Sequence, residues 1–194
     1  MQQKDHQADK IWIDRVLAGD TAAFALLVKK HQGMAFTLAL KMVKSREEAE
    51  EVAQDAFLKA FRALRTYEQK ARFSTWLYRI VYTTALNHLK KKRISTVSVD
   101  DPYLDHENLA EHQNQLDALT ASEQKHFLNL ALEQLPGDDS FILTLYYLEE
   151  SPVAEICQIT GLTDSNVKIK LFRARKRLHA ALEQILKKET KELL

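Results

Sequence analysis

The chain has 194 residues, of which 45% are hydrophobic and 28% charged, so it holds enough apolar material for a core and is not globally disordered. Only four Gly and three Pro occur, which favours long helices and excludes a loop-rich or β-sandwich fold. No apolar run approaches the roughly 18 to 20 residues that span a bilayer. The N-terminus also lacks an apolar segment behind a basic start. We therefore expect a soluble, cytoplasmic, all-helical protein without membrane insertion.

Charge is unevenly distributed, although the formal net charge is only +1. Residues 94–124 contain no Lys or Arg, and their acidic members are Asp100, Asp101, Asp105, Glu107, Glu111, Asp117 and Glu123. A single charge run is usually a solvated face, but here basic clusters flank an acidic block on both sides, which suggests two contacts with nucleic acid. We predict two small helical domains, residues 8–94 and 123–190, joined by an acidic flexible linker, residues 95–122.

The first helices are predicted from apolar spacing on either side of residues 19–21, where a Gly can close one helix and a polar residue can cap the next. A longer helix should run from about Phe24 to Val43. Ser45 and Glu48, three residues apart, then predict a capping box at the start of a third helix.

The polar face of this third helix carries carboxylates one turn apart, Glu47, Glu51 and Asp55. Such a ridge can serve metal or acid/base chemistry. Carboxylate metal sites in helical bundles usually add inward-facing Glu-x-x-His pairs, and this helix has no His. Cys157, the only cysteine, cannot form an internal disulfide or a multi-cysteine site. We therefore expect a solvated or partner-binding ridge, with no catalytic residue, metal or cofactor.

Aromatic and basic residues interleave after the polar loop of residues 68–72, in a helix that ends with the cluster Lys90–Arg93. Aromatic faces stack on unpaired bases at about 1 to 3 kcal/mol each, so this composition suits single-stranded nucleic acid. The alternative is that the apolar members are core. We assign mainly to the core Phe73, Trp76, Leu77, Ile80 and Leu86. The remaining contact candidates are Tyr67, Arg72, Arg79 and the Lys90–Arg93 cluster.

A helix-turn-helix is predicted near the C-terminus. Two helices meet at Pro136-Gly137, a short helix follows Pro152, and Gly161 supplies a left-handed bend before Thr163 caps a helix that runs to about Glu183. The buried stripe of this last helix is expected to be Val167, Leu171, Ala174 and Leu178. Its exposed side carries amide and cationic groups, which fit a DNA major groove better than an anionic membrane surface.

Taken together, these motifs resemble the bacterial extracytoplasmic-function sigma factors of the sigma-70 family, which are RNA polymerase initiation factors. Residues 23–28, 51–62 and 73–80 are similar to region 2 of that family. Residues 135–136, 155–156 and 166–178 are similar to region 4. A similarity to region 2 followed, across an acidic linker, by a similarity to region 4 is a far more specific signal than a helix-turn-helix alone.

The resemblance implies partners and roles. Core RNA polymerase would be a partner through its clamp helices and its flap. The clamp helices would be met by a ridge of Glu51, Gln54, Asp55, Lys59 and Arg62. The minus-thirty-five promoter element would be read as duplex by Asn166, Lys168, Ile169, Lys170, Phe172, Arg173 and Arg177. The minus-ten element would be met during strand separation by Tyr67, Arg72, Trp76, Arg79, Thr83, Lys90 and Arg93. An anti-sigma partner is possible, and the free protein is expected to be a monomer.

Two other functions stay open at this point. A stand-alone helix-turn-helix regulator would bind duplex DNA tightly and specifically without polymerase, using the N-terminal half to dimerise. A helical metalloenzyme built on the carboxylate ridge would bind metal and lose turnover when Glu51 is changed to Gln.

Overall fold

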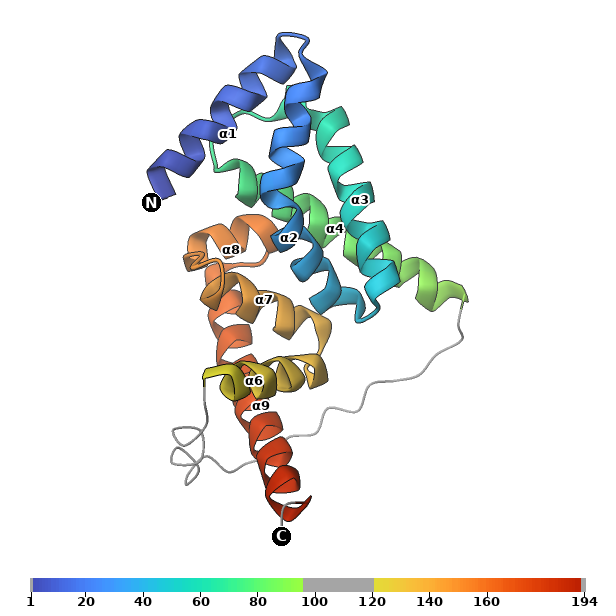
Figure 1. Ribbon diagram of the computed structural model, residues 1–194, viewed down its shortest axis with the longest axis vertical. Helices are drawn as coiled ribbons and strands as arrows, with labels where there is room; N and C mark the ends of the chain where they lie inside the picture. Colours follow the sequence, from blue (N-terminus) through green and yellow to red (C-terminus); the bar gives the residue numbers. More distant parts are fainter. Residues whose placement is uncertain (1, 96–120, 193–194) are drawn as a thin grey trace.

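The computed structural model describes residues 2–95 and 121–192, and this part of the chain is built from helices without strands (Figure 1). The all-helical prediction is therefore confirmed. The first domain contains α1 (Gln2–Leu17), α2 (Phe24–Val43), α3 (Arg46–Ala63) and α4 (Phe73–Ser95), with single 3-10 turns at Thr21–Ala23 and Leu64–Thr66. The second contains α6 (Ala121–Gln134), α7 (Gly137–Tyr147), α8 (Val153–Thr160) and α9 (Asp164–Glu192). Of the predicted linker, residues 96–120 lie outside the described residues.

Helices α2, α3 and α4 pack against one another and form the core of the first domain. The buried face of α3 carries small side chains, Ala49, Ala53, Ala56 and Ala60, which let the neighbouring helices approach closely. Phe73 and Leu77 of α4 are fully buried, as predicted. Trp76, Ile80 and Leu86 pack against this core but remain partly exposed.

A buried polar cluster ties α1 to α2. The carboxylate of Asp9 lies 3.2 Å from His31 Nε2 and 2.9 Å from Lys30 Nζ. Burial by itself raises the pKa of Asp9, but the hydrogen bonds from His31 and Lys30 lower it below its ordinary value. The charged form of Asp9 therefore helps to hold α1 across α2.

The second domain contains the predicted helix-turn-helix. Gly161 ends α8 with φ +76°, and the Thr163 hydroxyl accepts a hydrogen bond from the backbone N–H of Asn166. Val167, Leu171 and Ala174 are buried. Helix α9 extends beyond the predicted end near Glu183 because its apolar residues continue at helical spacing and pack against α6.

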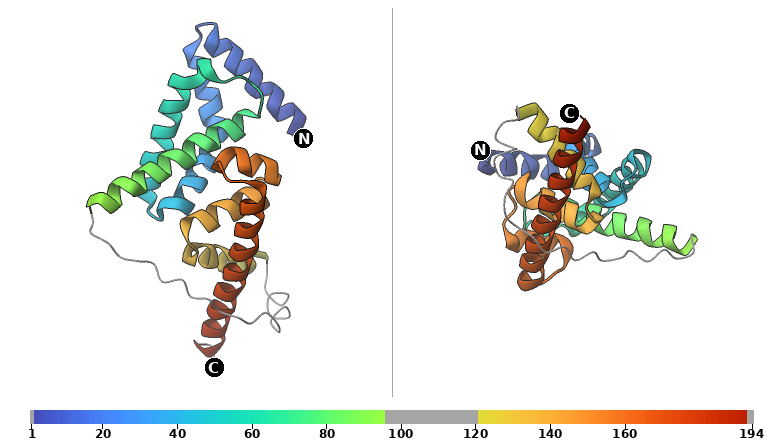
Figure 2. Two further views of the ribbon diagram at one scale, coloured as in Figure 1. Left: turned by 180° about the vertical axis from the view of Figure 1, so that it is seen from behind. Right: turned by 90° about the horizontal axis from the view of Figure 1, so that it is seen from below.

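The two domains touch. Helix α7 packs against α2 and α8 packs against α4, and both contacts are seen from the front and from behind (Figures 1 and 2). We call this pair of helix contacts the domain contact. Among the described helices, none is long and apolar enough to cross a membrane.

Candidate nucleic-acid interface

The outward side of α9 presents most of the residues predicted to read duplex DNA. Those that are exposed are Asn166, Lys168, Ile169, Phe172 and Arg173. Two of them are large apolar side chains, and Ile169 is 49% and Phe172 58% exposed. Large apolar groups surrounded by amide and cationic groups on the second helix of a helix-turn-helix suit contact with base edges and thymine methyl groups.

The other two predicted residues of α9 face α7 instead. Lys170 Nζ lies 3.3 Å from an Asp138 oxygen, and the Arg177 guanidinium binds the buried carboxylate of Asp139. Both carboxylates stand in the first turn of α7, where negative charge is favoured by the helix dipole. Lys170 and Arg177 therefore hold the two helices together, and contact with DNA would require them to leave these partners.

An aromatic and cationic cluster extends this face. Of its members, only Phe172 was predicted to contact DNA, and Tyr146, Tyr147, Arg175 and Lys176 were given no individual role. Arg175 Nε donates to the Tyr147 hydroxyl at 2.8 Å, and its guanidinium stacks 5.2 Å from the centre of the Tyr146 ring. Lys176 lies over the Phe172 ring at 5.1 Å. The adjacent tyrosines at the end of α7 were the signal that could have identified the cluster.

A second exposed face runs along α4. Arg79, Thr83, Asn87 and Lys90 are all exposed, and their spacing of three or four residues places them on one side of the helix. The Thr83 hydroxyl donates to the carbonyl of Arg79 at 3.0 Å, within its own helix. Arg93 belongs to the last turn of α4, but its side chain lies outside the described residues.

The remaining predicted minus-ten residues stand around the loop before α4. Tyr67 is only 8% exposed, its hydroxyl donates to the Ala71 carbonyl at 2.6 Å, and its ring centre lies 5.0 Å from that of Trp76. Trp76 is half-buried. Arg72 lies 3.2 Å from the Glu155 carboxylate of α8. The structure brings these residues together, with Tyr67 anchoring the loop rather than offering a free ring face.

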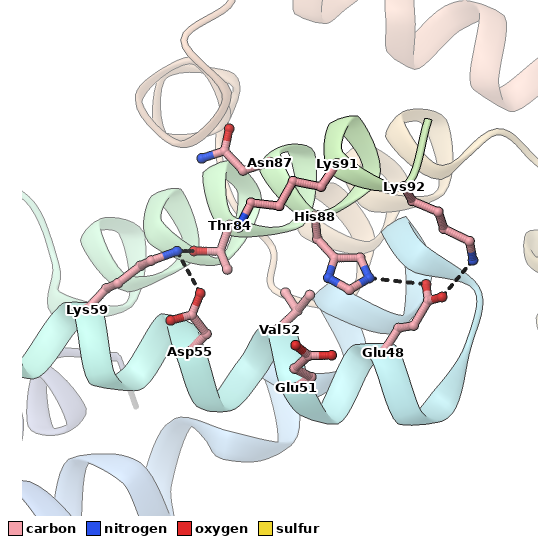
Figure 3. Close-up of a pocket in the computed structure, with 10 residues that line it drawn as sticks. All are labelled: Glu48, Glu51, Val52, Asp55, Lys59, Thr84, Asn87, His88, Lys91 and Lys92. Atoms are coloured by element: carbon pink, nitrogen blue, oxygen red, sulfur yellow. Dashed lines mark hydrogen bonds and ion pairs between the residues drawn. The ribbon is translucent and has the colours of Figure 1, made fainter. Parts of the chain in front are cut away.

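The predicted ridge on α3 is largely accessible. Glu51, Gln54, Lys59 and Arg62 are exposed, and Asp55 is half-buried. Asp55 pairs with Lys59 Nζ at 2.7 Å, and the same ammonium donates to the buried Thr84 hydroxyl of α4. A polar pocket opens between α3 and α4 beside this pair (Figure 3).

The capping box predicted from Ser45 and Glu48 forms only in part. Ser45 Oγ does accept from the Glu48 backbone N–H at 3.4 Å. The Glu48 carboxylate, however, reaches across the pocket to Lys92 Nζ at 2.6 Å and His88 Nε2 at 3.5 Å (Figure 3). The hydrogen bond from Lys92, and the positive charge nearby, lower the pKa of Glu48. Sequence reasoning missed His88 because it lies on another helix.

Within residues 2–95 and 121–192, no group of three or more His, Cys, Asp and Glu side chains is placed to hold a metal ion. Two carboxylates of α3 are instead paired with cations, Asp55 with Lys59 and Glu48 with Lys92.

An apolar groove lies beside the ridge, between α2 and α3, and it includes Leu58 and Phe61, which are 54% and 39% exposed. This arrangement is typical of a protein-binding surface with an apolar centre and a charged rim.

Comparison with known proteins agrees with the two-domain geometry. The family model described as Sigma-70 region 2 matches residues 27–94, and the model described as Sigma-70, region 4 matches residues 128–178. The RNA polymerase sigma-H factor of Pseudomonas aeruginosa is 34% identical over 188 residues, covering 93% of this chain and 97% of that protein. The ECF RNA polymerase sigma-E factor of Escherichia coli K12 is 31% identical over 186 residues, with the same coverage of both chains. The chain therefore belongs to the extracytoplasmic-function sigma factors of the sigma-70 family.

Two solved structures share this fold. CnrH, in complex with the cytosolic domain of CnrY, has a TM-score of 0.59 at 21% identity and covers 91% of this chain and 98% of its own. The sigma factor RpoE of Bartonella quintana, in complex with the anti-sigma factor NepR, has a TM-score of 0.61 at 21% identity and covers 82% and 96%.

Proposed function

We propose that this chain binds core RNA polymerase through α3 and directs it to specific promoters. In this proposal, α9 reads the minus-thirty-five element as duplex, and α4 with the preceding loop meets the minus-ten element as the strands separate. The observation that carries the proposal is the presence, in one chain of this family, of an exposed face of amide, apolar and cationic side chains on α9 and a separate exposed polar face on α4.

The exposure of α9 supports duplex reading. Asn166, Lys168 and Arg173 present one amide and two cations toward solvent, and these groups can bind adenine, guanine or phosphate in a major groove. Lys168 also pairs with Asp164 at 2.6 Å, but both side chains are more than half exposed. Such a surface ion pair contributes at most about 1 kcal/mol, so a phosphate can displace it.

The outer face of α4 supports contact with the minus-ten element. Arg79 and Lys90 provide positive charge at the two ends of the stripe, and Thr83 and Asn87 lie between them. Cations along a strand bind phosphates, while short polar groups can form hydrogen bonds with an extruded base. Trp76 precedes Arg79 by three residues on α4, and its ring packs against Tyr67, whose hydroxyl holds the preceding loop in place.

The ridge on α3 and the apolar groove beside it support polymerase binding. Exposed Leu58 and Phe61 provide an apolar centre, and Glu51, Gln54 and Arg62 provide a polar rim. A helical partner with complementary charges would cover both features. A possible anti-sigma partner, of the kind seen with the Bartonella quintana protein, stays a prediction that co-purification from the source organism can test.

Run-off transcription on fragmented DNA of the source organism tests the proposal. Core polymerase alone is compared with core plus this protein at matched salt, because contacts with phosphate depend on salt. We expect discrete new transcripts. Their yield should fall about tenfold or more when Lys168 and Arg173 are both changed to Ala, because each well-formed base contact contributes about 1 to 3 kcal/mol.

The matched control removes two other exposed cations, Lys10→Ala with Lys187→Ala, and should leave the transcripts unchanged. The absence of new transcripts together with no co-elution with core polymerase would overturn the proposal. The stand-alone regulator would then be favoured, since the reading face of α9 is exposed without polymerase. Tight, sequence-specific binding of duplex DNA by the protein alone would be its signature.

A further inference from the structure

One cation of α9 is held by a neutral group rather than by a carboxylate. Three neighbouring cations of the helix are paired with carboxylates, Lys168 with Asp164, Lys170 with Asp138 and Arg177 with Asp139. Arg175 instead donates from Nε to the Tyr147 hydroxyl at 2.8 Å, and no carboxylate among the described side chains pairs with it. The side chain of Arg175 is therefore held in place while its positive charge is left uncompensated.

Two tyrosine rings at the end of α7 fix the orientation of this guanidinium. Its central carbon lies 5.2 Å from the centre of the Tyr146 ring and 5.6 Å from that of the Tyr147 ring. The two rings stand at 80° to each other, with their centres 5.0 Å apart. A guanidinium carries five N–H donors, and the bond to Tyr147 uses the one on Nε. The four donors on the two terminal nitrogens form a planar fork that can hold two phosphate oxygens at once.

Arg175 continues the row of α9 residues that were predicted to read duplex DNA. Lys168, Phe172 and Arg175 follow one another at spacings of four and three residues, so these exposed side chains lie along one side of the helix. Seven residues of helix rise about 10 Å, which places Arg175 two turns beyond Lys168. In a helix-turn-helix, the N-terminal part of the second helix contacts the base edges. A cation two turns further along therefore stands where the helix leaves the groove, beside the phosphates.

We propose that Arg175 binds one phosphate of the promoter duplex and that Tyr147 positions it for this contact. The inference rests on the proposed function, because it adds a backbone contact to the helix proposed to read the minus-thirty-five element. A phosphate contact carries no direct information about the base sequence, but it fixes how the reading residues lie over the bases. Arg175 thus sets the register of α9 on the duplex, whereas the residues before it read the bases.

The tyrosine contacts make this arginine a better phosphate ligand than an unrestrained one. A long exposed side chain loses rotamer freedom when it binds, and this loss weakens binding. In Arg175 that freedom is already restricted, because Nε is bound to Tyr147 and two rings flank the guanidinium. The Tyr147 hydroxyl carries no charge, so it does not compete with a phosphate as a carboxylate does. Lys168 provides the contrast, since Asp164 pairs with it at 2.6 Å.

Arg175→Gln tests the phosphate contact, because glutamine keeps a polar side chain and removes the charge. The measured quantity is the dissociation constant of core polymerase carrying this protein on a promoter found by run-off transcription, determined over a range of salt concentrations. One phosphate contact contributes about 0.9 to the slope of log affinity against log salt, so the variant should lose about that much slope and about eightfold in affinity at about 0.1 M salt. The loss should be the same on a duplex with altered minus-thirty-five bases.

Three further variants separate a phosphate contact from other losses. Lys187→Gln is the matched control, since it removes an exposed cation from the same helix about three turns further along, and it should leave slope and affinity unchanged. Arg173→Gln removes a cation predicted to read bases, so its effect should depend on the minus-thirty-five sequence. Arg175→Lys keeps the charge without the planar fork, so it should keep the slope and lose part of the affinity. Urea unfolding checks that these exposed substitutions leave the fold intact.

Tyr147→Phe tests the positioning role, because it keeps the ring and removes only the hydroxyl that accepts from Arg175. It should weaken promoter binding about twofold or more in the unsubstituted chain and have no further effect in Arg175→Gln, as expected for two groups that act through one contact. Equal effects of Tyr147→Phe in both chains would show that the hydroxyl acts independently of Arg175 and would overturn the positioning role.

Duplexes in which one phosphate at a time is replaced by a neutral methylphosphonate locate the contact. The loss caused by Arg175→Gln should vanish on one of these duplexes. An unchanged salt slope, or a loss that persists on every duplex, would overturn the phosphate site, and weaker co-elution with core polymerase would then assign Arg175 to a protein partner. If the unsubstituted protein forms no promoter complex with core polymerase, the proposed function fails. The salt slope of the protein alone on the same duplex still decides whether Arg175 binds phosphate.

Discussion

At the scale of single residues, Tyr67 shows how one buried hydroxyl shapes a candidate binding loop. The hydroxyl donates to the carbonyl of Ala71, at the far end of the loop that precedes α4. Burial raises the pKa of Tyr67 to about 12, and the charge of Asp9 contributes to the same shift. The folded chain therefore keeps the Tyr67 proton at pH values where the unfolded chain releases it.

Changing Tyr67 to Phe should lower the free energy of unfolding by about 1 kcal/mol near pH 8, because the partly buried carbonyl of Ala71 loses its donor. A tyrosine whose pKa is raised on folding stabilises the protein below pH 10 and loses this contribution as pH rises through about 12. The difference between the two proteins should therefore shrink toward zero by pH 11. Urea unfolding at both pH values measures it.

Tyr146→Phe is the control, since the Tyr146 ring packs against its neighbours through its face. Its effect should stay below that of Tyr67→Phe at pH 8. Equal effects of the two substitutions would contradict a specific role for the Tyr67 hydroxyl.

At the scale of elements, the bend between α8 and α9 determines how α9 is presented to solvent. Gly161 adopts φ +76°, which side-chain-bearing residues rarely do, and its N–H donates to the Cys157 carbonyl at 2.8 Å. The Thr160 hydroxyl accepts from the Leu162 N–H, and Thr163 caps α9. Three short-range contacts therefore set the start of α9.

Changing Gly161 to Ala should destabilise the protein by about 1 to 2 kcal/mol, the approximate strain of a side chain in left-handed backbone. A Cβ at Gly161 meets nothing within 4 Å, so the effect is conformational rather than steric. Gly33→Ala, in the middle of α2, should instead stabilise by about 0.5 to 1 kcal/mol. Urea unfolding followed by circular dichroism compares them. An unchanged stability in Gly161→Ala would show that the turn can relax.

At the scale of the whole molecule, the domain contact holds a carboxyl group in an unfavourable setting. Burial raises the pKa of Glu149, and the negative charge of Glu155 raises it further. The hydrogen bond from Tyr78 and the positive charges of His31 and Arg72 offset only part of this effect. Packed in the domain contact, Glu149 therefore favours its protonated form more than a solvated glutamate does.

The contact between the two domains at Glu149 should weaken as pH rises. A carboxyl whose pKa is raised by packing stabilises the packed form below its ordinary pKa of 4.5, and this contribution is lost as pH rises through the raised value. Glu149→Gln keeps an acceptor for Tyr78 without the charge, so at neutral pH it should strengthen the domain contact and raise the free energy of unfolding measured in urea. The neighbouring, exposed Glu150→Gln should not. A decrease in Glu149→Gln would mean that attraction to Arg72 and His31 dominates.

Local sequence patterns predicted much of the fold. Apolar spacing predicted α2, α3 and α4, and Gly161 with Thr163 predicted the helix-turn-helix, because these features depend on residues a few positions apart. The same locality explains the incorrect part of the capping box. Ser45 and Glu48 fit the sequence pattern of a capping box. The Glu48 carboxylate instead pairs with a cation on α4, which no local sequence pattern identifies.

The sequence by itself determined the fold class, because apolar periodicity encodes which side of a helix is buried, and its motifs indicated the family. It also identified five exposed residues of α9, Asn166, Lys168, Ile169, Phe172 and Arg173. Only the tertiary structure decided which charges are free and which are paired, such as Arg177 with Asp139 and Arg72 with Glu155. It also brought Gly137 against Met42 and Lys44 against the end of α6. These contacts join residues far apart in the chain, and their energy depends on distance and burial, which a linear sequence does not specify.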